Sequence, residues 1–291
     1  MGNKSTGYRI FSVANNLLMV LILFACIYPF LYMLSLSLSN VKPVIEGKVF
    51  LYPMGFNLDA YKTILSYPNF FIAYRNTVFY TFAGSFIALF MTIIFAYPLS
   101  KTFLKGRGFI MNMVIFTMFF TGGIIPNFLV VSSLRLTDTV LAYLLPFAIS
   151  PFNLIILINF FMALPDSIEE AALIDGMSYI GILAKIIIPL SKPAIATITL
   201  FIAVFFWNDW FYGLIYMSNN SLYPVMLVLR NIVAGSSILG ASAGSASQDQ
   251  TVVYSTLKAS ASILTAVPII IFYPFLQRYF ITGLTIGSVK G

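Results

Sequence analysis

The densest group of charged side chains in this 291-residue sequence lies between two of its most apolar stretches. Glu169, Glu170 and Asp175 supply three of its nine acidic residues. Ser167 and Glu170 have the spacing of a capping box, in which two side chains satisfy exposed amides of the first helical turn, and Gly176 is typical of a helix end. A free helix of about two turns is marginal in water. The pattern therefore predicts a short acidic helix that another body holds, although helix rules alone fit a capped connector on the membrane surface equally well.

Residue types that carry catalysis are scarce in the rest of the chain. It has no histidine, and its only cysteine is Cys26. This excludes histidine acid–base chemistry, histidine metal ligands and an intrachain disulfide. The phosphate-binding pattern G-x-x-x-x-G-K-[ST] does not occur, so the chain cannot itself cradle ATP. We predict no catalytic residue, no metal site and no cofactor in this chain.

A second group of polar and aromatic side chains interrupts an apolar run. Asp209 is ionisable within a predicted membrane segment, which makes it a functional candidate. Aromatic faces stack on sugar rings while polar side chains bind sugar hydroxyls, so the group is a candidate wall of a sugar path. Its members are Trp207, Asn208, Asp209, Trp210 and Tyr212. The alternative is that Asp209 lies at the outer membrane boundary, with Trp210 as an interfacial anchor.

The composition places the elements that carry these groups in a membrane. The chain is 60% hydrophobic and 9% charged, with a mean hydropathy of +0.95, whereas soluble domains are about a quarter charged. Apolar runs of about 20 residues predict spanning helices. We predict one all-α integral membrane domain, residues 1–291, with six transmembrane helices at 12–36, 73–100, 108–133, 139–163, 193–217 and 259–281.

The distribution of basic residues orients these spans. Lys101, Lys105 and Arg107 crowd the short turn after the second predicted span, and short loops weigh most in the positive-inside rule. We therefore place both termini and the segment 164–192 in the cytoplasm, and the loop 218–258 outside. Within this loop, residues 235–251 are small and polar, which predicts a flexible surface segment. The net charge of +7 fits membrane anchoring rather than nucleic-acid binding.

The third predicted span contains helix breakers. Gly122, Gly123 and Pro126 lie within it. Broken helices at membrane depth are tolerated where they are buried in protein or line a cavity, although Gly and Pro are also common in membrane helices generally. We therefore add Gly122 and Gly123 to the candidate substrate path.

The spacing around the acidic helix resembles a known motif. Residues 170–189 read E-A-A-x3-G-x9-I-x-I-P, which resembles the EAA loop in the membrane subunits of ATP-binding-cassette (ABC) importers, except that Ile188 stands where that family most often has Leu. The segments FNLDAYKTIL, YRNTVFYT, FFWNDWFYGLIY and the carboxyl end YFITGLTIGSVKG resemble carbohydrate-type permeases of the same superfamily. GGIIPNF resembles the branch that handles complex oligosaccharides or polysaccharide fragments.

The resemblance implies the type I importer permease fold and a set of partners in a bacterial cytoplasmic membrane. These are a second, different permease, two ATPase subunits that bind ATP and Mg²⁺, an external solute-binding protein and a neutral or acidic oligosaccharide. In that family the short helix docks into a groove of the ATPase, and by resemblance residues 283–291 reach toward the same interface. The implied coupling residues are Ser167, Glu169, Glu170, Ala171, Ala172, Asp175, Gly176 and Pro189.

Two other classes of protein compete with this interpretation. A secondary transporter driven by an ion gradient would need more ionisable groups at membrane depth than Asp209 and often carries inverted repeats, of which we detect none. A membrane-embedded enzyme would need a polar catalytic cluster within the spans. Dependence of uptake on ATP separates the secondary transporter from an ABC importer.

Overall fold

The computed structural model describes residues 6–242 and 255–271, and within these ranges every regular element is a helix. The chain divides into two compact units, residues 1–68 with 229–267 and residues 69–228 with 268–291. The first unit contains α1 (Thr6–Ser37), α2 (Val41–Ile45), α3 (Asp59–Leu65), most of α14 (Val225–Ser242) and most of the helix Ser255–Ile271. The second contains α4 (Phe70–Ser100), α5 (Arg107–Phe119), α6 (Ile124–Ser133), α7 (Val140–Leu144), η1 (Leu145–Phe147), α8 (Pro151–Met162), α9 (Asp166–Ile174), α10 (Tyr179–Ile182), η2 (Leu183–Ile187), α11 (Ile188–Leu190), α12 (Lys192–Asn208), α13 (Phe211–Tyr216) and η3 (Asn220–Leu222).

The all-helical prediction is confirmed, whereas the count of six spans is not. By length and apolar composition, two helices among the described residues can cross a membrane, Phe11–Ser37 and Phe70–Ser100. Up to five can do so if each of three bent helix pairs counts as one span. The pairs are Arg107–Phe119 with Ile124–Ser133, Val140–Phe147 with Pro151–Met162, and Tyr179–Leu190 with Lys192–Asn208, bent by 117°, 46° and 83°. The predicted sixth span, 259–281, is described only as far as residue 271, and residues 283–291 lie outside the described ranges.

The predicted outer loop 218–258 is wrong in its first half. Helix α14 occupies Val225–Ser242, because this stretch begins with an apolar run whose side chains can be buried. Val225, Leu227 and Val228 are between 0 and 5% exposed. Residues 243–254 lie outside the described ranges.

In the first unit, α1 is a long apolar helix that the other described residues of this unit leave largely uncovered. Its most apolar 18-residue window has none of its residues buried. Contacts gather instead at its carboxyl end, where the Ser37 hydroxyl lies 2.8 Å from that of Tyr61. The Ser260 hydroxyl donates to the Ser37 carbonyl at 3.5 Å. An apolar surface of this kind suits contact with lipid or with other apolar helices.

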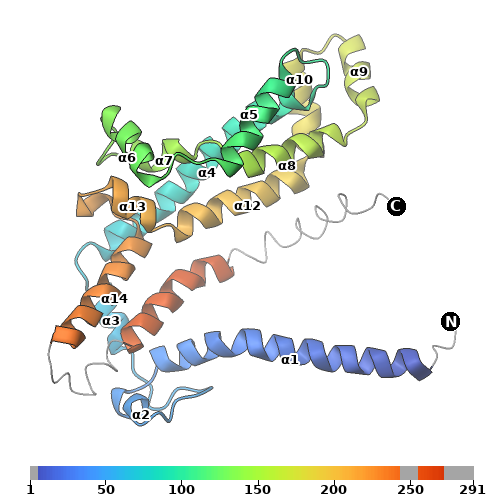
Figure 1. Ribbon diagram of the computed structural model, residues 1–291. Helices are drawn as coiled ribbons and strands as arrows, with labels where there is room; N and C mark the ends of the chain where they lie inside the picture. Colours follow the sequence, from blue (N-terminus) through green and yellow to red (C-terminus); the bar gives the residue numbers. More distant parts are fainter. Residues whose placement is uncertain (1–5, 243–254, 272–291) are drawn as a thin grey trace. The chain divides into compact units, whose positions relative to one another are not determined.

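In the second unit, α4 packs along α8 and α12 (Figure 1). Three aromatic side chains that are at most 1% exposed lie at and beside these contacts, namely Tyr80 of α4, Tyr143 of α7 and Phe206 of α12. The ring centroids of Tyr80 and Tyr143 lie 4.8 Å apart, and those of Tyr143 and Phe206 6.0 Å apart, within the range of favourable aromatic pairs. Gly84 of α4 leaves the space that the Phe206 ring fills, since an added Cβ would lie 2.4 Å from that ring.

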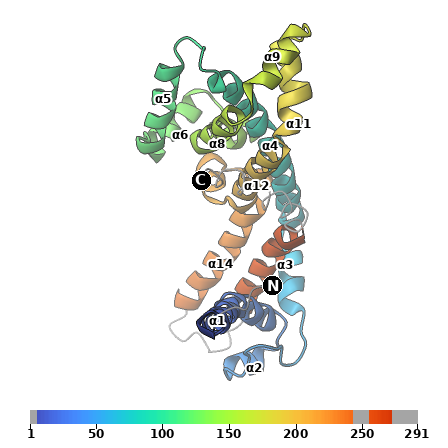
Figure 2. The same ribbon diagram turned by 90° about the vertical axis from the view of Figure 1, so that its right-hand side faces the viewer.

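The two ends of α4 hold different parts of the second unit. Its 31 residues span about 46 Å at the rise of an α-helix. Near the start, the Asn76 amide donates to the Ser221 carbonyl at 2.7 Å and the Tyr80 hydroxyl to the Leu222 carbonyl at 2.8 Å. Just past the end, Lys101 contacts Glu169 of α9. Within this unit, α9 thus lies at one end and α13 with the turn after it at the other, as both views show for α9 (Figures 1 and 2).

A turn closes the end of the unit opposite α9. The Asp138 amide donates to the Tyr216 carbonyl at 2.9 Å, and the Asp138 carboxylate accepts from the amides of Ser218 and Asn219 at 2.5 and 2.9 Å. These two backbone donors hold the pKa of the Asp138 carboxyl below its usual value, because they stabilise the charged form. If α4 crosses the membrane, this turn and α9 face opposite sides.

Candidate functional site

Helix α9 is the short acidic helix that the sequence predicts, but it begins differently. It spans Asp166–Ile174, its N-cap is Pro165 in an extended conformation (φ −62°, ψ 128°), and no side chain caps it. The predicted capping box is therefore wrong. The helix begins two residues earlier than a Ser167 cap would place it. Ser167 therefore lies inside the first turn, where its hydroxyl is not in the capping position. Asp166 and Glu169 in that turn still complement the positive end of the helix dipole.

The carboxyl end of α9 confirms the predicted role of Gly176. This glycine adopts φ +79°, a left-handed conformation that costs glycine nothing. Its amide donates to the Leu173 carbonyl and the Met177 amide to the Ala172 carbonyl, both at 3.0 Å. These two bonds satisfy carbonyls that a helix end otherwise leaves open. The chain thereby turns sharply away from α9.

The predicted coupling residues of α9 divide between two faces. Glu169 and Ala172, three positions apart, face the chain's own core and are 9% and 5% exposed. The exposed members are Ser167, Glu170, Ala171, Asp175 and Gly176. Ile174 joins them with 87% of its surface exposed, although we did not select it from the sequence. The outward face therefore combines the acid Glu170, the small residue Ala171 and the exposed apolar side chain of Ile174. On the opposite face, the small side chain of Ala172 lets α9 pack closely against the core of its own chain.

The segment after α9 leads directly into α12. Residues Tyr179–Leu190 form one helix, with a π-helical stretch at Leu183–Ile187. Pro189 follows that stretch and is exposed. Its ring nitrogen has no proton to donate, which favours a change in helical pairing just before it. The helix then bends by 83° into Lys192–Asn208. A displacement of α9 can therefore reach α12 through this one helix and the bend at its end.

The predicted break in the third span is confirmed in place. Helices α5 and α6 are separated at residues 120–123 and bent by 117°, and Gly123 adopts φ +89° and ψ 175°. Figure 2 shows the two helices together on one flank of the second unit. Neither Gly122 nor Gly123 lines the pocket described below.

The group around Asp209 forms a helix break. Helix α12 ends at Asn208, earlier than the predicted span, because Asp209 has extended backbone (φ −73°, ψ 128°). Its carboxylate accepts from the amides of Tyr212 and Gly213, both at 3.3 Å, at the start of α13, as a capping side chain does.

The other aromatic and amide side chains predicted for the substrate path mostly pack or bond within the chain. The ring of Trp207 meets Tyr74 edge-on at 5.8 Å, Trp210 meets Phe211 at 5.6 Å, Tyr212 meets Phe147 at 4.4 Å, and the Asn208 amide donates to the Val204 carbonyl at 2.9 Å.

A pocket of about 470 Å³ lies beside this break, between α8, α12 and α4. Its walls are mostly aromatic and aliphatic, lined by Ala88, Phe147, Ile149, Ser150, Pro151, Phe152, Asn153, Phe201, Ile202, Phe205 and Phe206. None of the seven residues predicted for the substrate path lines it. The closest link is Tyr212, whose ring contacts that of Phe147 at a tilt of 53°.

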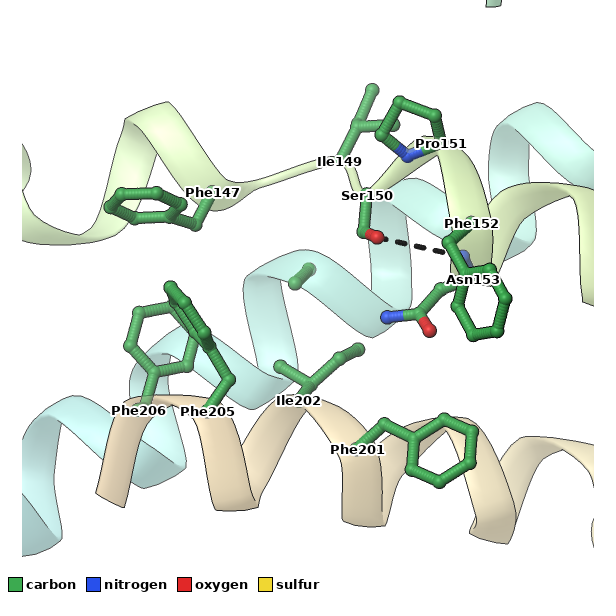
Figure 3. Close-up of a pocket in the computed structure, with 11 residues that line it drawn as sticks. Phe147, Ile149, Ser150, Pro151, Phe152, Asn153, Phe201, Ile202, Phe205 and Phe206 are labelled. Atoms are coloured by element: carbon green, nitrogen blue, oxygen red, sulfur yellow. Dashed lines mark hydrogen bonds between the residues drawn. The ribbon is translucent and has the colours of Figure 1, made fainter. Parts of the chain in front are cut away.

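Asn153 is a polar lining side chain that the sequence analysis missed, as is Ser150. It is 6% exposed, and its amide group lies in the pocket between α8 and α12 (Figure 3). Within the described ranges, no hydrogen bond satisfies this amide group, whereas its backbone N–H donates to the Ser150 hydroxyl at 3.5 Å. Because this amide faces the pocket, it can exchange hydrogen bonds with a ligand hydroxyl. The available signal was a lone Asn after Ser150-Pro151 in an apolar run.

Comparisons with known proteins add to this geometry. No family model matches the chain. It is 43% identical over 291 residues to Protein LplC of Bacillus subtilis (strain 168), covering 100% of this chain and 98% of that protein. It is 41% identical over 273 residues to the polygalacturonan/rhamnogalacturonan transport system permease protein YtcP of the same organism, covering 93% and 96%. It also resembles, with a TM-score of 0.85 and 34% identity over 96% of this chain and 100% of the other, a chain of a bacterial ABC transporter involved in the import of the acidic polysaccharide alginate.

Proposed function

Since this chain belongs to the permease subunits of ABC sugar importers, we propose that it moves oligosaccharides or polysaccharide fragments across a bacterial cytoplasmic membrane as one half of a two-chain pore. The other half is a second, different permease. Two ATPase subunits bind ATP and Mg²⁺, and an external solute-binding protein delivers the sugar. Both termini lie in the cytoplasm, and this chain itself catalyses no reaction. Nothing in the likenesses favours the ion-gradient transporter.

The outward face of α9 is the observation that carries the proposal. Ile174, at 87% exposure, is available for an apolar contact with a partner surface. The acidic side chain of Glu170 beside it is also exposed. Both lie at the end of the second unit opposite the Asp138 turn. This arrangement supports α9 as the docking helix for a cytoplasmic ATPase.

In the proposed mechanism, ATP binding closes the two ATPases and brings the docked helices together. Movement of α9 reaches α12 through the helix Tyr179–Leu190, and the permease pair changes from inward-facing to outward-facing. Hydrolysis resets the pair. Because the pocket is walled by α8, α12 and α4, a shift of α12 changes the shape of its walls.

The docking proposal predicts a crosslink from α9 to the ATPase. In a chain whose Cys26 is replaced by Ser, Ile174→Cys carrying a photoactivatable thiol reagent is expected to crosslink to the ATPase in the assembled importer. The measurement is the mass shift of the permease band, with the partner identified by mass spectrometry. The control is Ile125→Cys in α6, whose native side chain is 73% exposed. Crosslinking of the ATPase from residue 125 and none from residue 174 would contradict the proposal.

We further propose that the pocket around Asn153 lies on the sugar path. Its aromatic walls suit the faces of sugar rings and its free amide suits a hydroxyl. None of its lining residues in the described part of the chain is charged, so these residues suit hydroxyl groups, and any preference for acidic sugars must arise elsewhere.

Replacing Asn153 tests this assignment. Asn153→Leu removes the amide at similar volume, and we expect the KM for sugar uptake to rise by up to about tenfold, the value of one hydrogen bond, while ATPase activity and assembly persist. The matched variant is Asn208→Leu, whose amide bonds within α12 and does not line the pocket. A raised KM in Asn208→Leu with an unchanged KM in Asn153→Leu would move the path to the residues first predicted.

A further inference from the structure

The attachment of α9 to its own chain depends on few side chains. Its nine residues are too few for a helix to be stable alone in water. Glu169 and Ala172 are its buried residues. Ala172 contributes a small apolar contact, whereas Glu169 brings a carboxylate out of water. A carboxylate at such a position requires a charged partner.

That partner is Lys101, the residue that caps the end of α4. Its Nζ and the Glu169 Oε1 form an ion pair, and the two side chains are 13% and 12% exposed. The charges suit the helix ends that carry them, since cations are favourable at a helix C-terminus and anions in the first turn. Arg107 lies nearby, but its guanidinium donates to the Leu99 carbonyl at 2.7 Å and contacts Met162.

Tyr97, one turn before Lys101, holds both members of the pair. Its hydroxyl donates to the Glu169 Oε2 at 3.3 Å, and the Lys101 Nζ lies 4.9 Å from the centroid of its ring, within the range of a cation–π contact. Tyr97 is itself 7% exposed and packs edge-on against Phe161 of α8 at 6.4 Å. Three groups from α4 and α9 thus form one buried polar cluster on the end of the packed helices.

We propose that Tyr97, Lys101 and Glu169 form a joint that positions α9 on α4 and transmits its movement to the spanning helices. The inference rests on the proposed docking of α9 to an ATPase. An apolar contact of the same volume would stabilise the fold as well as a buried ion pair, but it would allow α9 to slide. A hydrogen-bonded ion pair fixes the orientation of α9 relative to α4. A displacement of α9 is therefore transmitted to α4 as well as along the chain to α12. Lys101 and Glu169 are therefore positioning residues.

The test compares single and double neutral variants in the complete importer reconstituted in lipid. Glu169→Gln and Lys101→Met each leave one buried charge unpaired, and we expect both to reduce assembly. The double variant removes both charges, and we expect wild-type amounts of complex with retained ATPase subunits. Its sugar transport per ATP hydrolysed is nevertheless expected to fall at least about fivefold, the lower end of typical coupling effects.

The transport-to-hydrolysis ratio separates positioning from a structural role. A double variant that assembles and transports per ATP like the wild type would overturn the inference, because the pair would then serve only the fold. Glu46→Gln is the control, since it breaks an ion pair with Lys48 whose side chains are 38% and 63% exposed, and we expect no change. Failure of the proposed function is distinguishable, because the wild-type complex itself would show no ATP-dependent uptake.

Discussion

Gly176→Val is expected to abolish most sugar transport while the chain still inserts in the membrane. A Cβ at this position would meet none of the described residues within 4 Å, so the substitution does not crowd them. Its cost comes from the backbone, because φ +79° is unfavourable by about 1–2 kcal/mol for residues with a side chain. Such a difference corresponds to roughly a 5- to 30-fold change in an equilibrium. The helix end would move, and with it the outward face of α9. The measurement is uptake in cells, normalised to permease in the membrane.

Two milder substitutions at the same position show which property matters. Asn visits the left-handed region more readily than Ala, although it is the larger of the two. If the backbone conformation decides, Gly176→Asn transports better than Gly176→Ala, and both exceed Gly176→Val. The reverse order, with Gly176→Ala above Gly176→Asn, would contradict this explanation and would mean that the ATPase surface approaches residue 176 too closely for a side chain.

The long helices could be predicted from the sequence because their cause is local. The predicted first and second spans, 12–36 and 73–100, differ from α1 and α4 by at most six residues at any end. Uninterrupted apolar runs permit few other structures in a membrane. The break at Gly122-Gly123 was marked by residue type, whereas the break after Asn208 was not predicted, since the fifth predicted span, 193–217, runs through it. The bend of 117° between α5 and α6 was not predicted either, because it depends on which neighbours the two halves contact.

The start of α9 and the existence of α14 show where local patterns misled. The spacing of Ser167 and Glu170 fits a capping box, yet Pro165 supplies an extended residue at the N-cap and the helix begins before Ser167. The small polar residues after Gly235 concealed the apolar run that opens α14 at Val225. In both cases the structure follows from a segment next to the recognised pattern. For α9 this is Pro165, and for α14 it is the apolar run that begins at Val225.

The candidate site was predictable in part, because its most distinctive contacts join distant residues. Gly176 and the exposed acid Glu170 follow from the motif alone. Lys101 and Glu169 are 68 positions apart, and a single sequence contains no sign that they meet. The pocket likewise depends on how α8, α12 and α4 pack, so its aromatic residues resemble ordinary span residues until the helices are placed.

Gly84→Ala is expected to destabilise the chain strongly although alanine is the better helix former. The added Cβ would lie 2.4 Å from Cε2 and 2.5 Å from Cζ of Phe206, closer than packed atoms approach. The Phe206 ring is 1% exposed and is held by Phe205 and Tyr143, with centroids at 5.3 and 6.0 Å, so it cannot swing aside. Overpacking of this kind costs about 1–3 kcal/mol. We expect a lower midpoint of thermal unfolding for the full chain in detergent, and reduced transport because α4 and α12 are forced apart.

Gly108→Ala separates crowding from helix propensity. Gly108 lies in α5, and a Cβ there would meet none of the described residues within 4 Å. Alanine favours a helix over glycine by up to about 1 kcal/mol, so Gly108→Ala is expected to leave the midpoint of thermal unfolding unchanged or to raise it. Combining Gly84→Ala with Phe206→Leu removes ring atoms from the crowded space and should recover part of the loss. Equal midpoints for Gly84→Ala and Gly108→Ala would mean that the α4–α12 contact yields easily. This result would contradict the view that close packing of α4 against α12 fixes the wall of the pocket.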